Sequence, residues 1–126
     1  MYMIRIAVVD DEKIILDSIS EKVSDIFNEY KVEFEKYNFT DGKSLIKSYF
    51  QKRFDLIFLD IDMPNITGID IAEKLRSYDD SVEIIFVTNK EKMVYQTLKY
   101  APFRFIRKSE FHIEIDEAID NFLKKE

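Results

Sequence analysis

The sequence predicts one α/β domain in three layers, with a parallel sheet between two layers of helices. Two observations predict this fold class. Apolar runs of strand length alternate five times with segments whose apolar residues recur at helical spacing, a pattern that gives parallel strands joined by right-handed crossovers. One run, Leu56–Leu59, is apolar throughout, which suits a strand buried on both faces. The length of 126 residues suits a single domain.

The first predicted strand, residues 4–9, is apolar except for Arg5 and ends at Asp10-Asp11. An amphipathic helix follows over about residues 12–29, because apolar residues recur there every three or four positions. Residues 32–37 predict a second strand, which we expect to be more exposed than the first.

The next two elements lead to the middle of the sheet. Thr40-Asp41-Gly42 indicates a turn and the start of a short helix that reaches about Lys52. The third strand is the apolar run 56–59, and it cannot keep a charge along its buried length. Asp60 must therefore stand at its carboxyl end, ahead of a loop at Pro64-Asn65.

Thr67-Gly68 leads into a third helix, which ends at the polar connection 77–81. Residues 82–87 form another mostly apolar run, which predicts the fourth strand. This strand ends at Thr88-Asn89.

The last two helices flank a short fifth strand. The spacing of Val94, Leu98 and Ala101 predicts a helix, and Pro102 ends it. Residues 103–106 then predict the fifth strand. The closing helix buries an apolar stripe made of Ile115, Ala118, Ile119, Phe122 and Leu123.

Composition excludes several kinds of site. The net charge of −6 argues against nonspecific nucleic-acid binding, which needs clustered Lys and Arg. The absence of cysteine excludes disulfides and thiol chemistry, and a single histidine, His112, excludes a histidine metal cluster. The chain starts without a signal-peptide pattern, and no apolar run approaches the ~20 residues of a membrane helix. We therefore expect a cytoplasmic domain with no membrane partner.

Polar side chains stand at the ends of four predicted strands. Asp10 and Asp11 follow the first strand, and Asp60 ends the third. Thr88 ends the fourth strand, and Lys108 follows the fifth. In a parallel sheet these ends lie at one edge, where open α/β sheets bind their ligands. We therefore expect an acid cluster, a hydroxyl and an amine to converge there.

Three clustered carboxylates repel one another, since two charges ~4 Å apart interact by ~4 kcal/mol at an effective dielectric of about 20. Either their pKa values rise or a cation binds, and oxygen ligands in a small pocket favour Mg²⁺. A carboxylate beside Mg²⁺ can attack phosphorus and form an aspartyl phosphate, whose oxygens Thr88 and Lys108 would hold. The alternative is a structural acid cluster paired with Lys108, which carries a standing desolvation cost.

These residues resemble, along the whole chain, the receiver domains of response regulators in two-component signalling. The acid pair of that family is matched by Asp10-Asp11. Its phosphorylation motif is matched by Asp60, Met63-Pro64 and Gly68. The resemblance implies a flavodoxin-like receiver fold over residues 1–126, with five helices and the strand order 2-1-3-4-5.

The resemblance also implies roles for these residues. Asp60 would accept a phosphoryl group from the phosphohistidine of a sensor histidine kinase. Mg²⁺ would be ligated directly by Asp11, Asp60 and the backbone carbonyl of Asp62, and through water by Asp10. The chain would then act as a switch, whose only chemistry is its own phosphorylation and dephosphorylation, rather than as an enzyme.

Further matches lie in the last two strands. Thr88 matches the switch hydroxyl of the family, Lys108 its lysine, and Phe105 its aromatic switch residue. Thr88 and Lys108 would hold the phosphoryl group, and their movement would be passed to Phe105. Residues 86–89 and 103–108 further resemble the LytTR (AgrA/LytR-like) subgroup.

The subgroup resemblance implies partners as well. A DNA-binding output domain, absent from this chain, would follow the receiver and would make the only contact with DNA. A homodimer through the face that contains the last strand and its flanking helices is a further expected assembly, and transcription regulation is the expected outcome.

The chain departs from the family at two positions. Most receivers place a proline with a cis bond after the lysine, and here the residue is Ser109. A cis bond before a residue other than proline costs ~3–4 kcal/mol, so we expect a trans bond. Phe105 lacks the hydroxyl of the tyrosine found in many receivers, so any switching there must work by packing.

Two other functions compete with the receiver. Asp60-Ile61-Asp62 also resembles the nucleophile motif of haloacid-dehalogenase-type phosphatases, in which the second aspartate is a general acid. A receiver-like module that works without phosphorylation is the other alternative. In the receiver hypothesis the Asp62 side chain is either a solvated acid or a modulator of the phosphoryl lifetime, and Lys90 could pair with it across the entrance.

Overall fold

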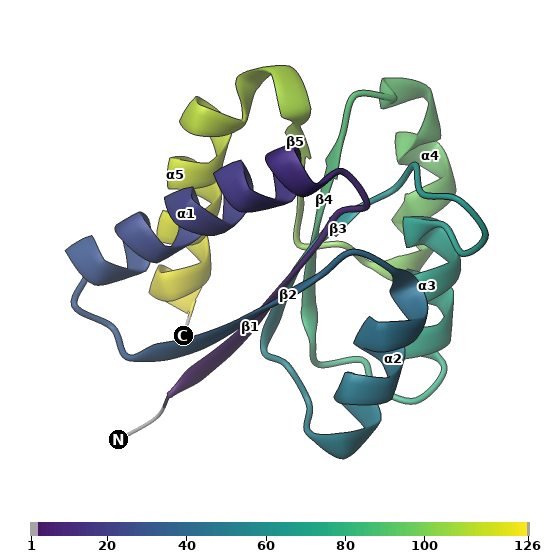
Figure 1. Ribbon diagram of the computed structural model, residues 1–126, viewed down its shortest axis with the longest axis horizontal. Coiled ribbons are helices and arrows are strands. Elements are labelled where there is room, and N and C mark those ends of the chain that lie inside the picture. Colours follow the sequence, from purple (N-terminus) through teal and green to yellow (C-terminus); the bar gives the residue numbers. More distant parts are fainter. Residues whose placement is uncertain (1–2, 126) are drawn as a thin grey trace.

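The computed structural model describes residues 3–125, except for the side chain of Glu91. In this range the chain forms one sheet of five parallel strands in the order β2-β1-β3-β4-β5, as predicted (Figure 1). The strands are β1 (Ile4–Val9), β2 (Phe34–Phe39), β3 (Leu56–Asp60), β4 (Glu83–Thr88) and β5 (Arg104–Arg107).

Helices cover both faces of the sheet. Figure 1 shows α1 and α5 on one face and α2, α3 and α4 on the other. The α-helices are α1 (Lys13–Glu29), α2 (Gly42–Gln51), α3 (Gly68–Arg76), α4 (Val94–Thr97) and α5 (Phe111–Lys125). Short 3-10 turns are η1 (Glu91–Met93), η2 (Leu98–Tyr100) and η3 (Lys108–Glu110). Among the described residues, no helix is both long enough and apolar enough to cross a membrane.

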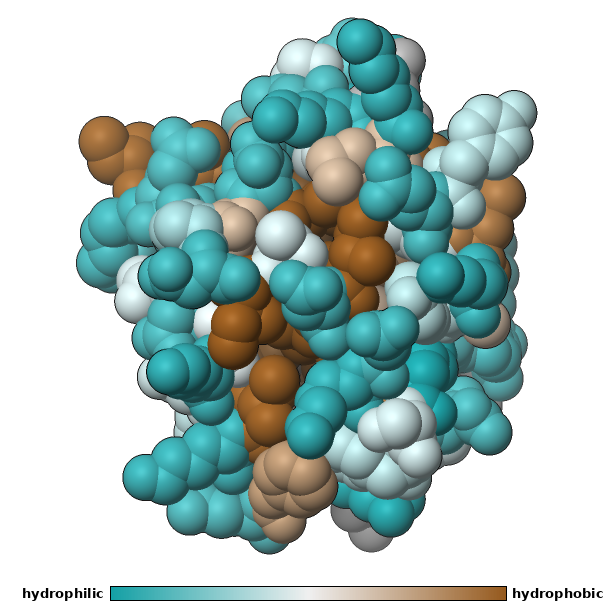
Figure 2. Space-filling view, turned by 90° about the vertical axis from the view of Figure 1, so that its right-hand side faces the viewer, coloured by the Kyte–Doolittle hydropathy of each residue, from teal (hydrophilic) through white to brown (hydrophobic). Residues whose placement is uncertain are grey.

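Strand alternation divides the interior into two cores. On β1, Ile6 and Val8 face the core under α1 and α5, whereas Ala7 and Val9 face the core under α2 and α3. All residues of β3 are buried, as its unbroken apolar run predicts. Figure 2 shows that a strip of apolar side chains remains visible on the face that carries α2, α3 and α4, between hydrophilic borders.

Arg5 is the exception that the sequence pattern left unexplained. Its guanidinium lies 4.9 Å from the ring centre of Tyr37 and 4.8 Å from that of Phe54. The same group forms an ion pair with Glu35, and its Nε donates to the carbonyl of Arg53 at 2.9 Å. A charge on a buried strand is therefore stabilised by partners from β2 and from the loop before β3.

The helix predicted to end at Pro102 is present, but it is irregular. Only a single α-helical turn forms, between η1 and η2. Thr97 and Tyr100 are buried, whereas Leu98 is 53% exposed. Pro102 disfavours right-handed helical backbone at Ala101, and Ala101 takes the left-handed conformation (φ 50°, ψ 56°). For a residue with a Cβ that conformation costs about 1–2 kcal/mol.

The polar connection after α3 is ordered by one buried carboxylate. Asp79 is only 7% exposed. It accepts hydrogen bonds from the amide of Ser81 at 2.8 Å, from the Ser81 hydroxyl at 2.6 Å, and from the hydroxyl of Tyr49 on α2. Asp79 therefore joins the α3–β4 connection to α2.

Asp79→Asn is expected to lower the free energy of unfolding by about 1–2 kcal/mol, because an amide accepts these hydrogen bonds less strongly than a carboxylate. Urea denaturation followed by circular dichroism measures the change. Asp80→Asn is the matched control, since Asp80 is exposed. Equal stability of Asp79→Asn and the control would contradict the assigned role.

Candidate functional site

The ends of four strands place the predicted polar residues at one edge of the sheet. Asp60 is the last residue of β3 and Thr88 the last of β4. Asp10 directly follows β1, and Lys108 directly follows β5. Because the four strands are parallel neighbours in one sheet, these residues leave it on the same side.

Lys108 binds both buried carboxylates of this edge. Its Nζ lies 3.1 Å from Oδ2 of Asp10 and 3.1 Å from Oδ1 of Asp60. Asp10 is fully buried and Asp60 is 1% exposed. A third carboxylate, that of the more exposed Glu12, lies 3.9 Å from the same nitrogen. The ammonium thus connects residues that are 50 positions apart in sequence.

Burial and charge act together on the ionisation of this pair. The pKa of Asp60 is raised to about 7, chiefly by burial and next by the charge of Asp10, while Lys108 lowers it. Burial alone would lower the pKa of Lys108, but the carboxylates of Asp60 and Asp10 hold it above its usual value. The lysine is therefore charged, while Asp60 is a carboxyl that binds protons readily.

The acids at this edge have unused binding capacity. Oδ2 of Asp60 is buried and accepts no hydrogen bond from the described residues, whereas Oδ2 of Asp10 pairs with Lys108 at 3.1 Å. Carboxylate oxygens of Asp10, Asp11 and Glu12 lie within 4.8 Å of one another. Three carboxylates, those of Asp10, Glu12 and Asp60, lie within 3.9 Å of the Lys108 ammonium, and the oxygen donors of this edge fit a hard divalent cation such as Mg²⁺.

The cluster of Asp10, Asp11 and Glu12 differs from the ligands that the resemblance implies, because it includes Glu12 and leaves out Asp60. Glu12 belongs to it, although the sequence analysis did not single out that residue. The position of Glu12 directly after Asp10-Asp11 is the sequence feature that could have predicted its place in the cluster. Asp60 lies outside the cluster and connects to Asp10 through Lys108.

Asp62 and Lys90 meet at the entrance, as the sequence suggested. Lys90 Nζ lies 3.0 Å from Asp62 Oδ2, and both side chains are more than half exposed. Their backbones also contact the site. The Asp62 amide donates to Oδ1 of Asp60 at 3.3 Å, and the Lys90 amide donates to the hydroxyl of Thr88 at 2.9 Å.

Phe105 is half-buried on β5 and stacks on Phe86 of β4, with ring centres 5.7 Å apart and ring planes at 19°. Its contacts are therefore apolar packing, consistent with the missing hydroxyl. The bond between Lys108 and Ser109 is trans, as expected for a residue that is not proline.

Gly68 allows the loop after β3 to fold back onto Asp60. The Gly68 amide donates to the carbonyl of Ile61 at 2.9 Å. A Cβ on residue 68 would lie 2.1 Å from the backbone oxygen of Asp60. The helix α3 then starts with a capping box formed by Thr67 and Asp70. The glycine is thus required by the close approach of residue 68 to the backbone of Asp60.

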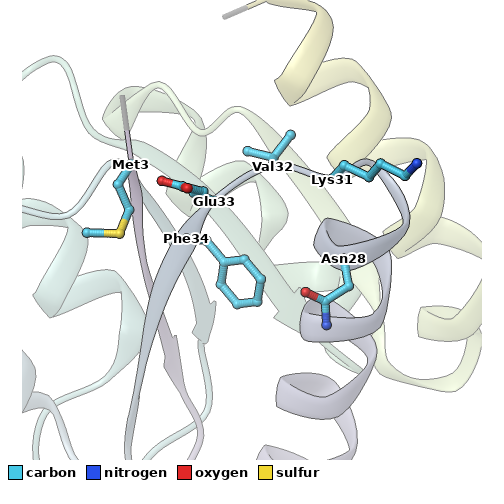
Figure 3. Close-up of a pocket in the computed structure, with 6 residues that line it drawn as sticks. All are labelled: Met3, Asn28, Lys31, Val32, Glu33 and Phe34. Atoms are coloured by element: carbon cyan, nitrogen blue, oxygen red, sulfur yellow. The ribbon is translucent and has the colours of Figure 1, made fainter. Parts of the chain in front are cut away.

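A separate pocket of about 390 Å³ lies away from the acids, at the opposite end of the sheet (Figure 3). It is formed where the chain enters β1 and β2 and where α1 ends. Its lining residues are Met3, Asn28, Lys31, Val32, Glu33 and Phe34. None of the predicted site residues contributes to it.

Comparisons with known proteins agree on one family. Residues 6–120 match the sequence model described as the response regulator receiver domain. The chain is 31% identical over 90 residues to the response regulator MprA of Mycolicibacterium vanbaalenii. That match covers 71% of this chain and 36% of MprA, so the chain spans about a third of the length of such curated relatives.

Solved structures share the whole fold. The response regulatory domain of the protein mrkE from Klebsiella pneumoniae has a TM-score of 0.86 at 20% identity, over 97% of both chains. The response regulator TrrA from Thermotoga maritima, solved in complex with Mg²⁺ and BeF, has a TM-score of 0.81 at 28% identity. The second match covers 94% of this chain and 98% of TrrA.

Proposed function

Since the chain belongs to the response regulator receiver family, we propose that it is a phosphorylation-activated switch of a two-component system. Asp60 would accept a phosphoryl group from a sensor histidine kinase in the cytoplasm, and the resulting change would act on a partner or an output domain. One observation carries the proposal: the buried carboxylate of Asp60 has one oxygen on Lys108 and one without a hydrogen-bond partner.

Mg²⁺ would be held by Asp10, Asp11, Asp60 and the backbone carbonyl of Asp62, with Glu12 close to the first two of these acids. When bound, it would screen the negative charge of the incoming phosphoryl group and stabilise charge during transfer. The number of acids at this edge and the unpaired Oδ2 of Asp60 support this assignment.

The residues of the chain supply the remaining steps. An oxygen of Asp60 would attack phosphorus and form an O–P bond, while the P–N bond breaks and the imidazole of the donor histidine leaves. Lys108 would turn from the two carboxylates to phosphoryl oxygens, and the Thr88 hydroxyl would bind another. These new contacts would favour a second conformation, in which the packing of Phe105 changes.

We propose that the kinase approaches over the start of α1. There a pocket of about 260 Å³ is lined by Lys108 together with Ile14, Ile15 and Phe111. Ile14 is 83% exposed, and Ile113 on the first turn of α5 is 73% exposed. An apolar surface beside the acceptor suits the helical partner that must bring a phosphohistidine to Asp60.

The output is also part of the proposal. Because the curated relatives are longer than this chain, we propose that a DNA-binding domain works with the receiver in transcription regulation. The motifs at 86–89 and 103–108 favour the LytTR subgroup, and this assignment rests on these motifs alone. A homodimer would use the face of β5, α4 and α5, where Tyr95 is 84% exposed.

Intact-mass spectrometry after incubation with acetyl phosphate tests the function. We expect one labile phosphoryl group per chain when Mg²⁺ is present, and none when EDTA replaces it. Failure to take up phosphate with Mg²⁺ would favour the interaction module that works without phosphorylation. Steady turnover of phosphate esters would instead favour the phosphatase.

A further inference from the structure

The segment between β4 and β5, residues 90–101, is held differently at its two ends. It consists of η1, the single turn α4, and η2, and it closes with the left-handed Ala101. We call it the switch segment. Its first residue contacts Thr88, so any movement of that hydroxyl reaches the segment first.

The far end of the switch segment is tied to α3 by Arg76. Nε of Arg76 donates to the carbonyl of Tyr100 at 2.8 Å, and Nη2 donates to the carbonyl of Ala101 at 3.2 Å. The Tyr100 hydroxyl donates to Oε2 of Glu73 at 3.2 Å, and the Tyr100 ring is buried. Two side chains one turn apart on α3 thus fix both the backbone and a side chain of this end.

The near end has weaker contacts. Lys90 pairs with Asp62 at 3.0 Å, but both side chains are more than half exposed, and such pairs contribute about 0.2–1 kcal/mol. A pocket of about 510 Å³ adjoins this end, lined by Asn89, Lys90, Lys92 and Met93. Apart from Met93, which packs against the core, the near end therefore has few contacts to lose, and it has space in which to move.

We propose that Arg76, with Glu73, forms a hinge that confines the movement of the switch segment to its near end. The inference rests on the proposed function, because the movement starts when Thr88 turns toward a phosphoryl group. The Thr88 oxygen then no longer accepts from the Lys90 amide in the same geometry. Held at Tyr100 and Ala101, the segment pivots about its far end rather than shifting as a whole.

Hydrogen–deuterium exchange measured by mass spectrometry tests the hinge. The protein is compared alone and with Mg²⁺ and beryllofluoride, a phosphoryl mimic. We expect amide exchange over residues 89–97 to change by ~tenfold, while exchange over 98–102 stays the same. A change of equal size over both stretches would overturn the hinge.

Arg76→Ala is expected to speed exchange over 98–102 in the free protein and to extend the beryllofluoride effect to that stretch. Lys74→Ala is the matched control, because Lys74 is an exposed cation on the same helix. Tyr100→Phe removes only the hydroxyl that contacts Glu73, and it tests the same hinge if Arg76→Ala does not fold. Unchanged exchange over 98–102 in the folded variants would overturn the proposal.

The same measurement separates the hinge from the proposed function. If beryllofluoride changes exchange over 60–68 but the near end of the switch segment does not respond, the hinge is wrong and the receiver function stands. If no stretch responds, including 60–68, the proposed function fails and the hinge fails with it.

Discussion

Asp60→Asn is expected to abolish Mg²⁺-dependent phosphoryl uptake from acetyl phosphate. The amide is close in size to the carboxylate, so the loop after β3 should keep its position. It carries no negative charge, however, and cannot attack phosphorus or ligate Mg²⁺ with the same strength. Intact mass measures the outcome, and a variant that still gains one phosphoryl group at the normal site would refute the assignment of Asp60.

Asp62→Asn provides the control for that experiment. Its side chain is exposed and pairs with Lys90, and only its backbone is proposed to bind metal. The variant should therefore still be phosphorylated, with at most a changed lifetime of the phosphoryl group. The phosphatase hypothesis predicts the opposite, because there the second aspartate is the general acid.

Asp60→Asn should also stabilise the metal-free fold at alkaline pH. The pKa of Asp60 is raised to about 7 by burial and by Asp10, above the value of about 3.9 for an unfolded chain. Between these values the native state binds more protons than the unfolded state, so the contribution of Asp60 falls as pH rises. We expect the stability advantage of the variant to grow from pH 4 to pH 7, by an amount of order 1 kcal/mol or more.

Denaturant unfolding in EDTA at several pH values measures this advantage. Other titrating groups are common to both proteins, so the difference between them isolates residue 60. A difference that does not change with pH would show that Asp60 is not destabilised by its surroundings.

Gly68→Ala is expected to reduce both stability and phosphorylation. A Cβ there would lie 2.1 Å from the carbonyl oxygen of Asp60 and 2.8 Å from Cα of Ile61. Both are backbone atoms, so no rotamer change can relieve the overlap, and overpacking of this kind costs about 1–3 kcal/mol. A displacement of ~1 Å at a reacting group can slow a reaction by ~100-fold, and we expect phosphorylation to slow by ~10–100-fold.

Gly42→Ala is the matched control, since Gly42 and Gly68 both stand at the first position of a helix. A Cβ at Gly42 would lie 2.7 Å from Cδ1 of Ile71, the mobile end of a side chain. This contact can be relieved at a lower energetic cost, and it involves no backbone atom of the loop after β3. Similar rates of phosphorylation in both variants would contradict the role assigned to Gly68.

Much of the fold and of the site follows from local patterns. The fully apolar run before Asp60 implies a strand buried on both faces, and parallel strands then bring Asp10 and Lys108 to the same edge. The geometry of the edge does not follow from those patterns. That Lys108 binds both buried carboxylates, and that Glu12 joins the acid cluster, depends on loop conformations with no periodic signal.

The structural features that the sequence patterns did not predict share a physical cause. Arg5 and Asp79 are buried polar groups whose partners come from distant segments, so their neighbours in sequence do not predict their burial. The switch segment is an irregular helix that ends at the left-handed Ala101 before Pro102, and Tyr100 rather than Leu98 is buried in it. Tertiary packing there overrides a weak helical pattern.

Because Lys108 bridges Asp10 and Asp60, a substitution of this lysine affects folding and signalling together. One ammonium is paired with two buried acids and is also proposed to hold the phosphoryl group. Its loss therefore combines a folding defect with a signalling defect, and a genetic screen for lost signalling would score the two together. In a variant whose residue 60 is already uncharged, loss of Lys108 should lower the free energy of unfolding by less, because fewer buried charges are left unpaired. Selection to preserve signalling would then also preserve the stability of this edge.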